Sequence, residues 1–397
     1  MRSFDSATPS LKTSTNRSSR IASPVRQRAW VEIDRAALRF NVRQLKQLLS
    51  PNTQLMAVVK ADAYGHGALL VAETVLEAGA GALAVATLQE GIQLRAAGIG
   101  APILVLGASN TGEEVEECAR FHLQPTLCNL QQARLFSNTL TRLRSTLPVH
   151  LNIDTGMSRL GTPWQETTAF VNGVRQMPQL QLAGLYSHFA TADDRDRATM
   201  QLQHQRFKSV LAQLQGENLP LPALHIANSA ATLCDRAAHY DWVRIGLALY
   251  GLYPAPHLRP TVDLKPALQV KARVTQVKTL SPGTGVSYGH RYIAEREMTV
   301  AIVAIGYADG VPRNLSNRLE VLIRGRKIPQ IGAITMDQLM LDASHLPDVQ
   351  PGEIVTLLGR DGSLEISADT WAETLGTISW EILCGFQHRL PRISIDR

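Results

Sequence analysis

The stretch LMAVVKADAYGHGALLVAETVLEAGAGALAVAT, residues 55–87, joins two short apolar runs through a helical segment. The runs LMAVVK (55–60) and ALAVAT (82–87) have the length and composition of buried strands, and GALLVAETVLEAG places apolar residues at helical spacing between them. A strand, a helix and a second strand in this order predict parallel strands with a crossover helix. Lys60 ends the first run, and a loop with a tyrosine, a histidine and two glycines follows it at once.

The same unit recurs along the chain as far as about Gly251. Six further apolar runs follow, separated by segments of helical periodicity: PILVLG (102–107), QPTLC (124–128), VHLNID (149–154), LAGLYSH (182–188), ALHIAN (223–228) and WVRIGL (242–247). Eight β-then-α units within about 220 residues favour a closed (β/α)8 barrel. An eight-stranded open sheet would show a similar pattern.

The character of the sequence changes after Gly251. The segment LYPAPHLRPTVDLKP is rich in proline, which is typical of a linker. Alternating runs then predict strands: LQVKARVTQVKTL, MTVAIVAIGYA, RLEVLIRG and EIVTLLG. We therefore expect an α/β fold in which a (β/α)8 TIM-type barrel at residues 29–262 is followed by a mostly antiparallel β domain at 263–397.

Composition and charge argue against several classes of protein. The 397 residues are 45% hydrophobic and 19% charged, as in ordinary globular proteins. The net charge is +6, but residues 1–28 hold six basic residues and one acidic residue, so the remainder carries about +1. We therefore expect no nucleic-acid partner. No apolar run reaches the roughly 18–20 residues of a membrane span, so no membrane partner is expected either.

The first 28 residues and the four cysteines bear on location. Residues 1–28 are rich in Ser, Thr and Arg and poor in large apolar residues, which predicts a disordered basic tail. Their low content of acidic residues also suits an organellar transit peptide. The cysteines show no CxxC spacing, which indicates a reduced, cytoplasmic compartment without a structural zinc or a disulfide framework.

Polar residues gather where the expected barrel strands end. Chemistry in such barrels is located at the C-terminal ends of the strands. The candidates at that rim are Lys60, Asp154, Arg159, His188, Asn228, Ser229, Arg244, Gly246 and Leu247. Any one of them alone is more often a capping or salt-bridging residue. Several polar groups on one rim favour a binding site.

The loops after the seventh and eighth strands predict an anion site. Such loops often bind phosphate in barrels. NSAATL (228–233) offers a serine hydroxyl and backbone N–H groups at a probable helix start, and Gly246 allows close backbone approach. A phosphate site across the barrel mouth from a buried lysine indicates pyridoxal phosphate, whose aldehyde bonds covalently to lysine. No metal site is expected, because HExxH and clustered carboxylates are absent.

GVSYG (285–289) matches the G-x-S-x-G nucleophile elbow of serine hydrolases. The elbow requires a strand, a sharp turn and a helix. Here the flanking sequence is rich in turn residues and runs into another strand. We interpret the motif as a glycine-rich β loop that carries Tyr288.

Nine motifs in this order resemble the alanine racemase family of fold-type III pyridoxal-phosphate enzymes, over about Trp30 to Arg392. They are AVVKADAYGHG, DTGMSRLG, SHFATAD, HIANSAATL, VRIGLALYGLYP, GVSYG, IGYADG, TMDQLM and CGFQHRLPR. The resemblance implies a barrel with a β domain, and a homodimer with its active sites at the interface. It also implies interconversion of L- and D-alanine with pyridoxal 5'-phosphate, which supplies D-alanine, for example for peptidoglycan.

The resemblance also implies roles for single residues. Lys60 looks like the covalent anchor of the cofactor and one catalytic base, and Tyr288 looks like the second base, supplied by the partner subunit. The implied cofactor-binding residues are Lys60, Tyr64, His188, Ser229, Arg244, Gly246 and Leu247. Arg244 would face the pyridine nitrogen, and His188 would lie between Arg244 and Tyr288.

The remaining implied residues act on the substrate. Arg159 and the backbone of Met336 would hold the substrate carboxylate, and Tyr307 and Arg313 resemble residues that line the access channel. Two positions depart from many relatives. Asn152 stands where a lysine, often carbamylated, is common, and His388 stands where a tyrosine near the phosphate is common.

Elementary chemistry agrees with the two bases. Racemisation removes a proton from one face of Cα and returns one to the other face, so two groups must flank the substrate. Free lysine and tyrosine, with pKa values of about 10.4 and 10, are too basic, and nearby cations lower both. Because a guanidinium only donates, Arg244 would leave a pyridine nitrogen unprotonated.

Three alternatives bind the same cofactor. A racemase with broader or different substrate preference, such as serine, would share these motifs. A non-catalytic pyridoxal-phosphate-binding protein would lack the C-terminal β domain and Tyr288. A fold-type III amino-acid decarboxylase normally pairs an acidic residue with the ring nitrogen, which Arg244 argues against.

Overall fold

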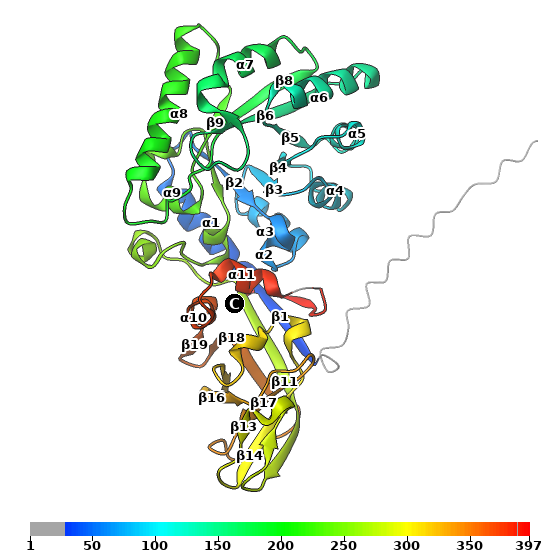
Figure 1. The fold of residues 1–397 in the computed structure, drawn as a ribbon, viewed down its shortest axis with the longest axis vertical. Coiled ribbons are helices and arrows are strands. Elements are labelled where there is room, and N and C mark those ends of the chain that lie inside the picture. Colours follow the sequence, from blue (N-terminus) through cyan, green and yellow to red (C-terminus); the bar gives the residue numbers. More distant parts are fainter. Residues whose placement is uncertain (1–27, 387) are drawn as a thin grey trace, which may run out of the picture.

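The structure is a computed structural model that describes residues 28–386 and 388–397. The expected basic tail therefore lies outside the described residues, apart from Arg28. Figure 1 shows a barrel of strands and helices with an elongated β structure at one end of it. No helix in the described ranges is long and apolar enough to span a bilayer.

The first part is the expected parallel barrel. Its strands follow the spatial order β10-β2-β3-β4-β5-β6-β8-β9, and each neighbouring pair is parallel. Their bounds are β2 (Gln54–Val58), β3 (Ala82–Val85), β4 (Ile103–Ala108), β5 (Gln124–Leu127), β6 (Leu147–Asp154), β8 (Leu180–Tyr186), β9 (Ala223–His225) and β10 (Trp242–Ile245). All eight predicted strands are present, and a two-residue strand, β7 (Thr162–Pro163), pairs with β6.

Backbone hydrogen bonds nearly close this sheet. The Arg244 amide donates to the Ala227 carbonyl at 2.9 Å, and the Asp241 amide donates to the Leu224 carbonyl at 3.1 Å. Both bonds join the segment of β9 to that of β10, the two ends of the strand order. The closed barrel is therefore confirmed over the open sheet, and the C-terminal strand ends form one rim.

Helices cover the outside of the barrel (Figure 1). Their bounds are α1 (Arg35–Leu48), α3 (Ala68–Glu77), α4 (Leu88–Ala96), α5 (Gly112–Arg120), α6 (Leu130–Leu143), α7 (Thr167–Arg175) and α8 (Ala198–Gly216). Two short helices, α2 (Lys60–Tyr64) and α9 (Ser229–Cys234), follow β2 and β9 at the rim. Capping boxes begin α4 and α5, in which Thr87 pairs with Glu90 and Thr111 with Glu114.

The second part is a nine-stranded, mostly antiparallel sheet. Its strands are β1 (Ala29–Asp34), β11 (Leu268–Leu280), β14 (Met298–Val303), β15 (Glu320–Ile323), β16 (Arg326–Ile331), β17 (Leu339–Asp342), β18 (Ile354–Asp361), β19 (Leu364–Ile366) and β20 (Arg392–Ile395). Strand β18 also pairs with β11, so the strands from β11 through β14, β17, β16 and β15 to β18 form a closed circuit. The helices α10 (Ala368–Leu375) and α11 (Ser379–Gly385) belong to this part of the chain.

Strand β1 does not belong to the barrel, although it begins the range 29–262 that was expected to form it. It pairs antiparallel with β11 and parallel with β20. The chain therefore starts in the second sheet and enters the barrel through α1. The bounds at 29–262 and 263–397 remain a prediction about domains.

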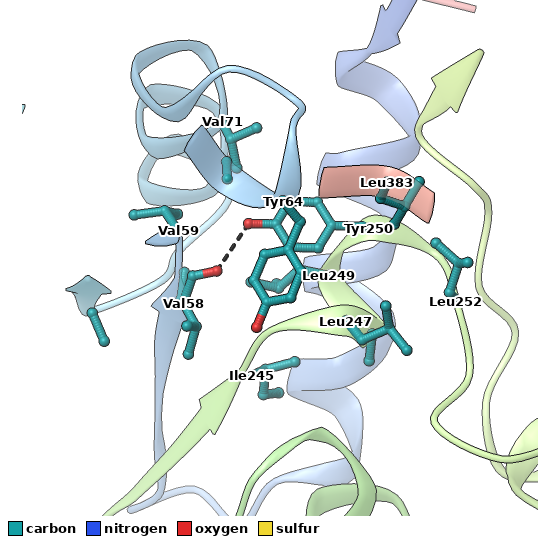
Figure 2. Close-up of a cluster of buried hydrophobic side chains, with 14 of the residues drawn as sticks. Val58, Val59, Tyr64, Val71, Ile245, Leu247, Leu249, Tyr250, Leu252 and Leu383 are labelled. Carbon is teal, nitrogen blue, oxygen red and sulfur yellow. Dashed lines mark hydrogen bonds between the residues drawn. The ribbon is translucent and has the colours of Figure 1, made fainter. Parts of the chain in front are cut away.

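Apolar packing joins the two parts. One cluster of buried side chains runs from the barrel strands into the second sheet, and a smaller cluster around Val300 and Met340 lies in the second sheet alone. Figure 2 shows the junction, where Leu383 of α11 lies beside Tyr64 and Tyr250 of the barrel. The second part of the chain therefore packs, through α11, against the rim that carries Lys60.

Arg28, at the start of the described chain, is predicted to stabilise the fold. Its guanidinium donates to Asp309 at 2.5 and 2.9 Å, and the Asp309 side chain is fully buried. Arg28→Gln should lower the free energy of unfolding by about 1–3 kcal/mol, because it removes charged hydrogen bonds from a buried carboxylate. Thermal unfolding measures the effect. Arg120→Gln, which breaks an exposed ion pair with Glu117, is the control, and equal losses would contradict the prediction.

Candidate active site

The candidate residues of the barrel rim line one cavity of about 540 Å3. Those predicted from the sequence are Lys60, Tyr64, Asn152, Asp154, Arg159, His188, Asn228, Ser229, Arg244, Gly246 and Leu247. They come from the ends of five different strands. The structure therefore brings together every cofactor-binding candidate of the barrel.

Lys60 begins an unusual turn. Residues Ala61, Asp62, Ala63 and Tyr64 all have left-handed backbone conformations, with φ between 52° and 54°. This conformation costs roughly 1–2 kcal/mol for each non-glycine residue. Such strain persists only where the surrounding structure enforces it, and it is concentrated at functional sites.

Hydrogen bonds from the barrel hold the start of this turn. The Glu90 carboxylate accepts from the Ala61 amide at 2.6 Å and also from the Ala86 amide at 2.8 Å. The Tyr250 hydroxyl donates to the Val58 carbonyl at 2.8 Å, as Figure 2 shows. Hydrogen bonds therefore hold the backbone both before Lys60, at Val58, and after it, at Ala61.

The surroundings of Lys60 favour its neutral form. Burial lowers the pKa of Lys60 below its usual value, and the positive charge of Arg159 lowers it further, whereas Glu90 raises it. A larger share of the Lys60 amine is therefore unprotonated at a given pH than for a lysine in water. An unprotonated amine can act as a nucleophile or as a base.

Ser229, Gly246 and Tyr64 form a small cradle. The Ser229 hydroxyl accepts from the Gly246 amide at 3.0 Å and lies at the start of α9. A Cβ at Gly246 would lie 2.5 Å from the Tyr64 hydroxyl, so a side chain there would displace the tyrosine. Buried hydroxyls and backbone N–H groups of this kind suit the oxygens of a phosphate.

Arg244 is almost completely buried, at 3% exposure, and donates to several groups around it. Its guanidinium donates to the Ser187 carbonyl at 2.7 Å, to His225 Nδ1 at 2.7 Å and to His188 Nδ1 at 3.1 Å. Burial lowers the pKa of Arg244 to about 10, so the group stays charged at neutral pH.

These contacts determine the tautomers of the histidines. Since a guanidinium has no acceptor, Nδ1 of His188 must accept, and its proton lies on Nε2. Burial and the charge of Arg244 lower the pKa of His188 to about 3, in agreement with a neutral ring. The His188 Nε2–H is thereby available as a donor.

A directed chain of hydrogen bonds continues behind Arg244, inside the barrel. His225 accepts at Nδ1, so its Nε2–H donates to His150 Nδ1 at 3.0 Å, and His150 Nε2–H donates to Gln124 at 3.0 Å. Burial lowers the pKa of His150 to about 4 and that of His225 well below its usual value. The chain fixes the Arg244 side chain with neutral partners.

Four predicted residues of the second part do not line this cavity. They are Tyr288, Met336, Tyr307 and Arg313. Tyr288 is 73% exposed and Met336 is 52% exposed, which is unusual for large apolar side chains. The Tyr307 amide donates to the Thr335 carbonyl at 3.0 Å, so Tyr307 and the Met336 loop are neighbours.

GVSYG is a β loop and not a hydrolase elbow. Gly285 and Val286 form β12, which pairs with β13 (Tyr292–Ile293), and only a 3-10 turn (Tyr288–His290) lies between them. The Ser287 hydroxyl donates to the Ala333 carbonyl at 2.7 Å. No α-helix follows the serine, so the interpretation as a β loop is confirmed.

Sequence reasoning missed several residues of the site. Trp380 and Cys384 of α11 line the cavity, and Tyr186 of β8 packs beneath Arg244, with its ring 4.9 Å from the guanidinium. Cys384 opens the motif CGFQHRLPR, which marked this segment without assigning it a role. In the described ranges no group of histidines, cysteines and carboxylates could hold a metal ion.

Sequence profiles decide the family. The profile of the alanine racemase N-terminal domain matches residues 33–254, and that of the C-terminal domain matches residues 267–394. The chain belongs to the alanine racemase family. A curated alanine racemase from Synechocystis sp. is 63% identical over 371 residues, which cover 94% of this chain and 100% of the relative.

Solved alanine racemases have the same fold. The structure of the enzyme from Clostridium difficile is 33% identical, covers 94% of this chain and 96% of its own, and has a TM-score of 0.90. An alanine racemase from Bartonella henselae, described with covalently bound pyridoxal phosphate, is 32% identical with a TM-score of 0.83. That alignment covers 93% of this chain and 100% of the relative.

Proposed function

We propose that this alanine racemase family member interconverts L- and D-alanine with pyridoxal 5'-phosphate. One observation carries the proposal. A single cavity combines Lys60, whose pKa is lowered, with the Ser229–Gly246 cradle and the buried Arg244. An isomerase of this kind needs an amine for the cofactor, an anion cradle and a donor for the ring.

The residues present fit this cofactor. The hydroxyls of Ser229 and Tyr64 border the backbone of Gly246, where a side chain would displace Tyr64, and such hydroxyls suit an anion site. Ser229, Tyr64, Gly246 and Leu247 would hold the phosphate, Arg244 would donate to the ring nitrogen, and Lys60 would form the covalent link. When bound, pyridoxal phosphate supplies an electron-withdrawing ring that acidifies the α-proton of an amino acid.

In this proposal, two bases act on opposite faces of the substrate. Lys60, fixed on its strained turn, takes or returns the proton on one face. The partner subunit's Tyr288 serves the other face. The His188 Nε2–H donates to the tyrosine oxygen, and the nearby charge of Arg244 favours its phenolate form. Arg159 and the backbone of Met336 hold the substrate carboxylate, so that Cα stays between the bases.

The position of Tyr288 supports the homodimer that we propose. In this chain Tyr288 is exposed and does not line the Lys60 cavity, so the cavity has no second base of its own among the described residues. A second copy would bring one in and cover Tyr288, Tyr307 and Met336. The cysteines of the described residues are all free, which supports a reduced, cytoplasmic location.

Asn152 brings no negative charge to this cavity, which Arg159 also lines. Asn152 is buried and lines the cavity with Arg159, and Arg159 takes part in no ion pair between described residues. We propose that solvent or a small anion such as chloride fills the space where a carbamylated lysine would stand. Arg159 is exposed in the single chain, so water or an anion from solution reaches its guanidinium.

Gly246→Ala should weaken cofactor binding. The added methyl group would lie against the Tyr64 hydroxyl and push it out of the cradle. Binding of pyridoxal phosphate, followed by its absorbance, should weaken by about tenfold or more, since a misplaced charged hydrogen bond costs about 1.5–3 kcal/mol. Gly216→Ala, at a position with open space, is the control. Unchanged affinity in Gly246→Ala would refute the proposed binding of the phosphate by this cradle.

The function itself is tested by incubating the purified chain and pyridoxal phosphate with single enantiomers of several amino acids. The proposal expects interconversion of alanine at the highest kcat/KM. Faster turnover of serine would establish the broader racemase instead. A bound cofactor without turnover of any amino acid would establish a non-catalytic binding protein.

A further inference from the structure

Arg392, in the terminal strand β20, contacts the turn that follows Lys60. The Arg392 guanidinium donates to the Gly65 carbonyl twice, from Nε at 3.1 Å and from Nη2 at 2.9 Å. It also lies 3.9 Å from the Asp62 carboxylate. Both partners belong to the loop that follows Lys60, more than 300 residues earlier in the chain.

The same guanidinium is held by its own part of the protein. Arg392 donates to the Phe386 carbonyl at 2.5 Å and to the Leu390 carbonyl at 2.8 Å. Strand β20 pairs with β1 in the second sheet, and β1 pairs with β11. Arg392 is therefore fixed to the second sheet while its side chain reaches the barrel.

Steric contact reinforces this link. Gly65 has a φ of 79° and lies so close to the Leu383 carbonyl of α11 that a Cβ would collide with it. The end of the left-handed turn thus rests against the second part of the chain. Its start is held by Glu90 and Tyr250 of the barrel.

The left-handed conformation of this turn depends on these contacts. Its four left-handed residues include no glycine, so the local sequence does not favour the conformation. The Gly65 amide donates to the Ala61 carbonyl within the turn at 3.0 Å, and the bonds from Arg392 add an anchor at the end of the turn from the second sheet. A guanidinium suits this task, because its planar fork can bridge several carbonyls at once and a lysine cannot.

We infer that Arg392 is a positioning residue for Lys60: it holds the strained turn from the second sheet and thereby keeps the Lys60 amine buried in the cavity. The inference rests on the proposed role of Lys60 as a base. The groups that face this amine are Arg159 after β6, His188 after β8, Glu90 on α4 and Cys384 on α11. Loosening the turn would let water reach the amine.

The test compares Arg392→Lys with Arg318→Lys in the holoenzyme. Arg318 is a matched control, because it also bonds backbone carbonyls, those of Asn314 and Thr374, away from the Lys60 turn. Hydrogen exchange at residues 61–67 should become about ten to a hundred times faster in Arg392→Lys, the size expected for losing one or two charged hydrogen bonds. Exchange in the strands of the barrel should stay as in the wild type.

A pH profile provides a second readout that a general loss of stability would not move. In the profile of kcat, the limb that belongs to Lys60 should shift to higher pH in Arg392→Lys, since burial is the main cause of its lowered pKa. Arg318→Lys should keep the wild-type profile. If both variants match the wild type in exchange and in pH profile, the inference is wrong.

Failure of the proposed function and failure of this inference give different results. A wild-type chain that does not racemise alanine refutes the proposed function, whereas an active wild type with an unaffected Arg392→Lys refutes only this inference. If Arg392→Lys does not fold, the inference is tested instead by hydrogen exchange in the wild-type holoenzyme at increasing denaturant concentration. Residues 61–67 should then open together with β20. Opening of the turn while β20 stays protected would overturn the inference.

Discussion

Replacing Lys60 by Ala should reduce alanine racemisation by about 10⁴-fold or more and remove the covalent link to the cofactor. The loss is expected to be the largest of any single substitution, because Lys60 is proposed both to anchor pyridoxal phosphate and to move a proton. Racemisation is followed by the change in optical rotation of L-alanine. The covalent link is followed by borohydride reduction and peptide mapping.

In the wild type, the reduced pyridoxyl label should be found on Lys60. Lys208→Ala is the control, because Lys208 lies on the exposed face of α8 and touches no part of the cavity. It should keep both the label and the rate. A label on another lysine, or a Lys60→Ala chain with a normal rate, would refute the assignment.

Tyr288→Phe should slow racemisation by about 10²–10⁴-fold, the usual contribution of a positioned acid–base group. The substitution keeps the ring and deletes only the hydroxyl that carries the proton. Because Tyr288 is 73% exposed in the single chain, the change should leave the fold and the bound cofactor unaffected. Steady-state rates in both directions measure the loss, with cofactor absorbance as the check on binding.

Exchange of the α-proton with deuterated water separates the two bases. In Tyr288→Phe, exchange for the enantiomer served by Lys60 should survive far better than exchange for the other. Tyr292→Phe, in the neighbouring strand β13, is the control and should leave both unchanged. Equal loss for both enantiomers with cofactor still bound would refute two separate bases.

The barrel and the rim of the site followed from sequence because their signals are local. Each parallel strand is a short apolar run next to an amphipathic helix, and the residue after each run is at the rim. Lys60, Arg159, Ser229 and Arg244 could therefore be placed together before the structure was known. The cavity confirms that they meet, while their chemical roles remain predictions.

Other features depend on contacts between distant segments. Strand β1 has no local feature that separates it from a barrel strand, and its partner β11 begins more than 200 residues later. The left-handed turn after Lys60 contains Ala, Asp, Ala and Tyr, none of which favours that conformation. Both are imposed by tertiary packing, which a single sequence does not display.

The chain behind Arg244 was missed for a similar reason. His225 and His150 lie on different strands, 75 residues apart, and each alone resembles an ordinary core histidine. Their alignment follows from the barrel, which brings β6 and β9 to either side of β8. Tyr288 was identified through resemblance to a family, and its proposed role at the site requires a second subunit.

Mixing two inactive chains tests the central claim most directly, namely that Lys60 and Tyr288 of different subunits complete one racemase site. Lys60→Ala and Tyr288→Phe chains with different affinity tags are co-expressed, and the heterodimer is purified through both tags. One of its two sites then combines an intact Lys60 with the partner subunit's Tyr288. The account predicts alanine racemisation at about half the wild-type rate per dimer, since one site in two is whole. A purified heterodimer with bound cofactor and no activity above that of either parent would contradict it.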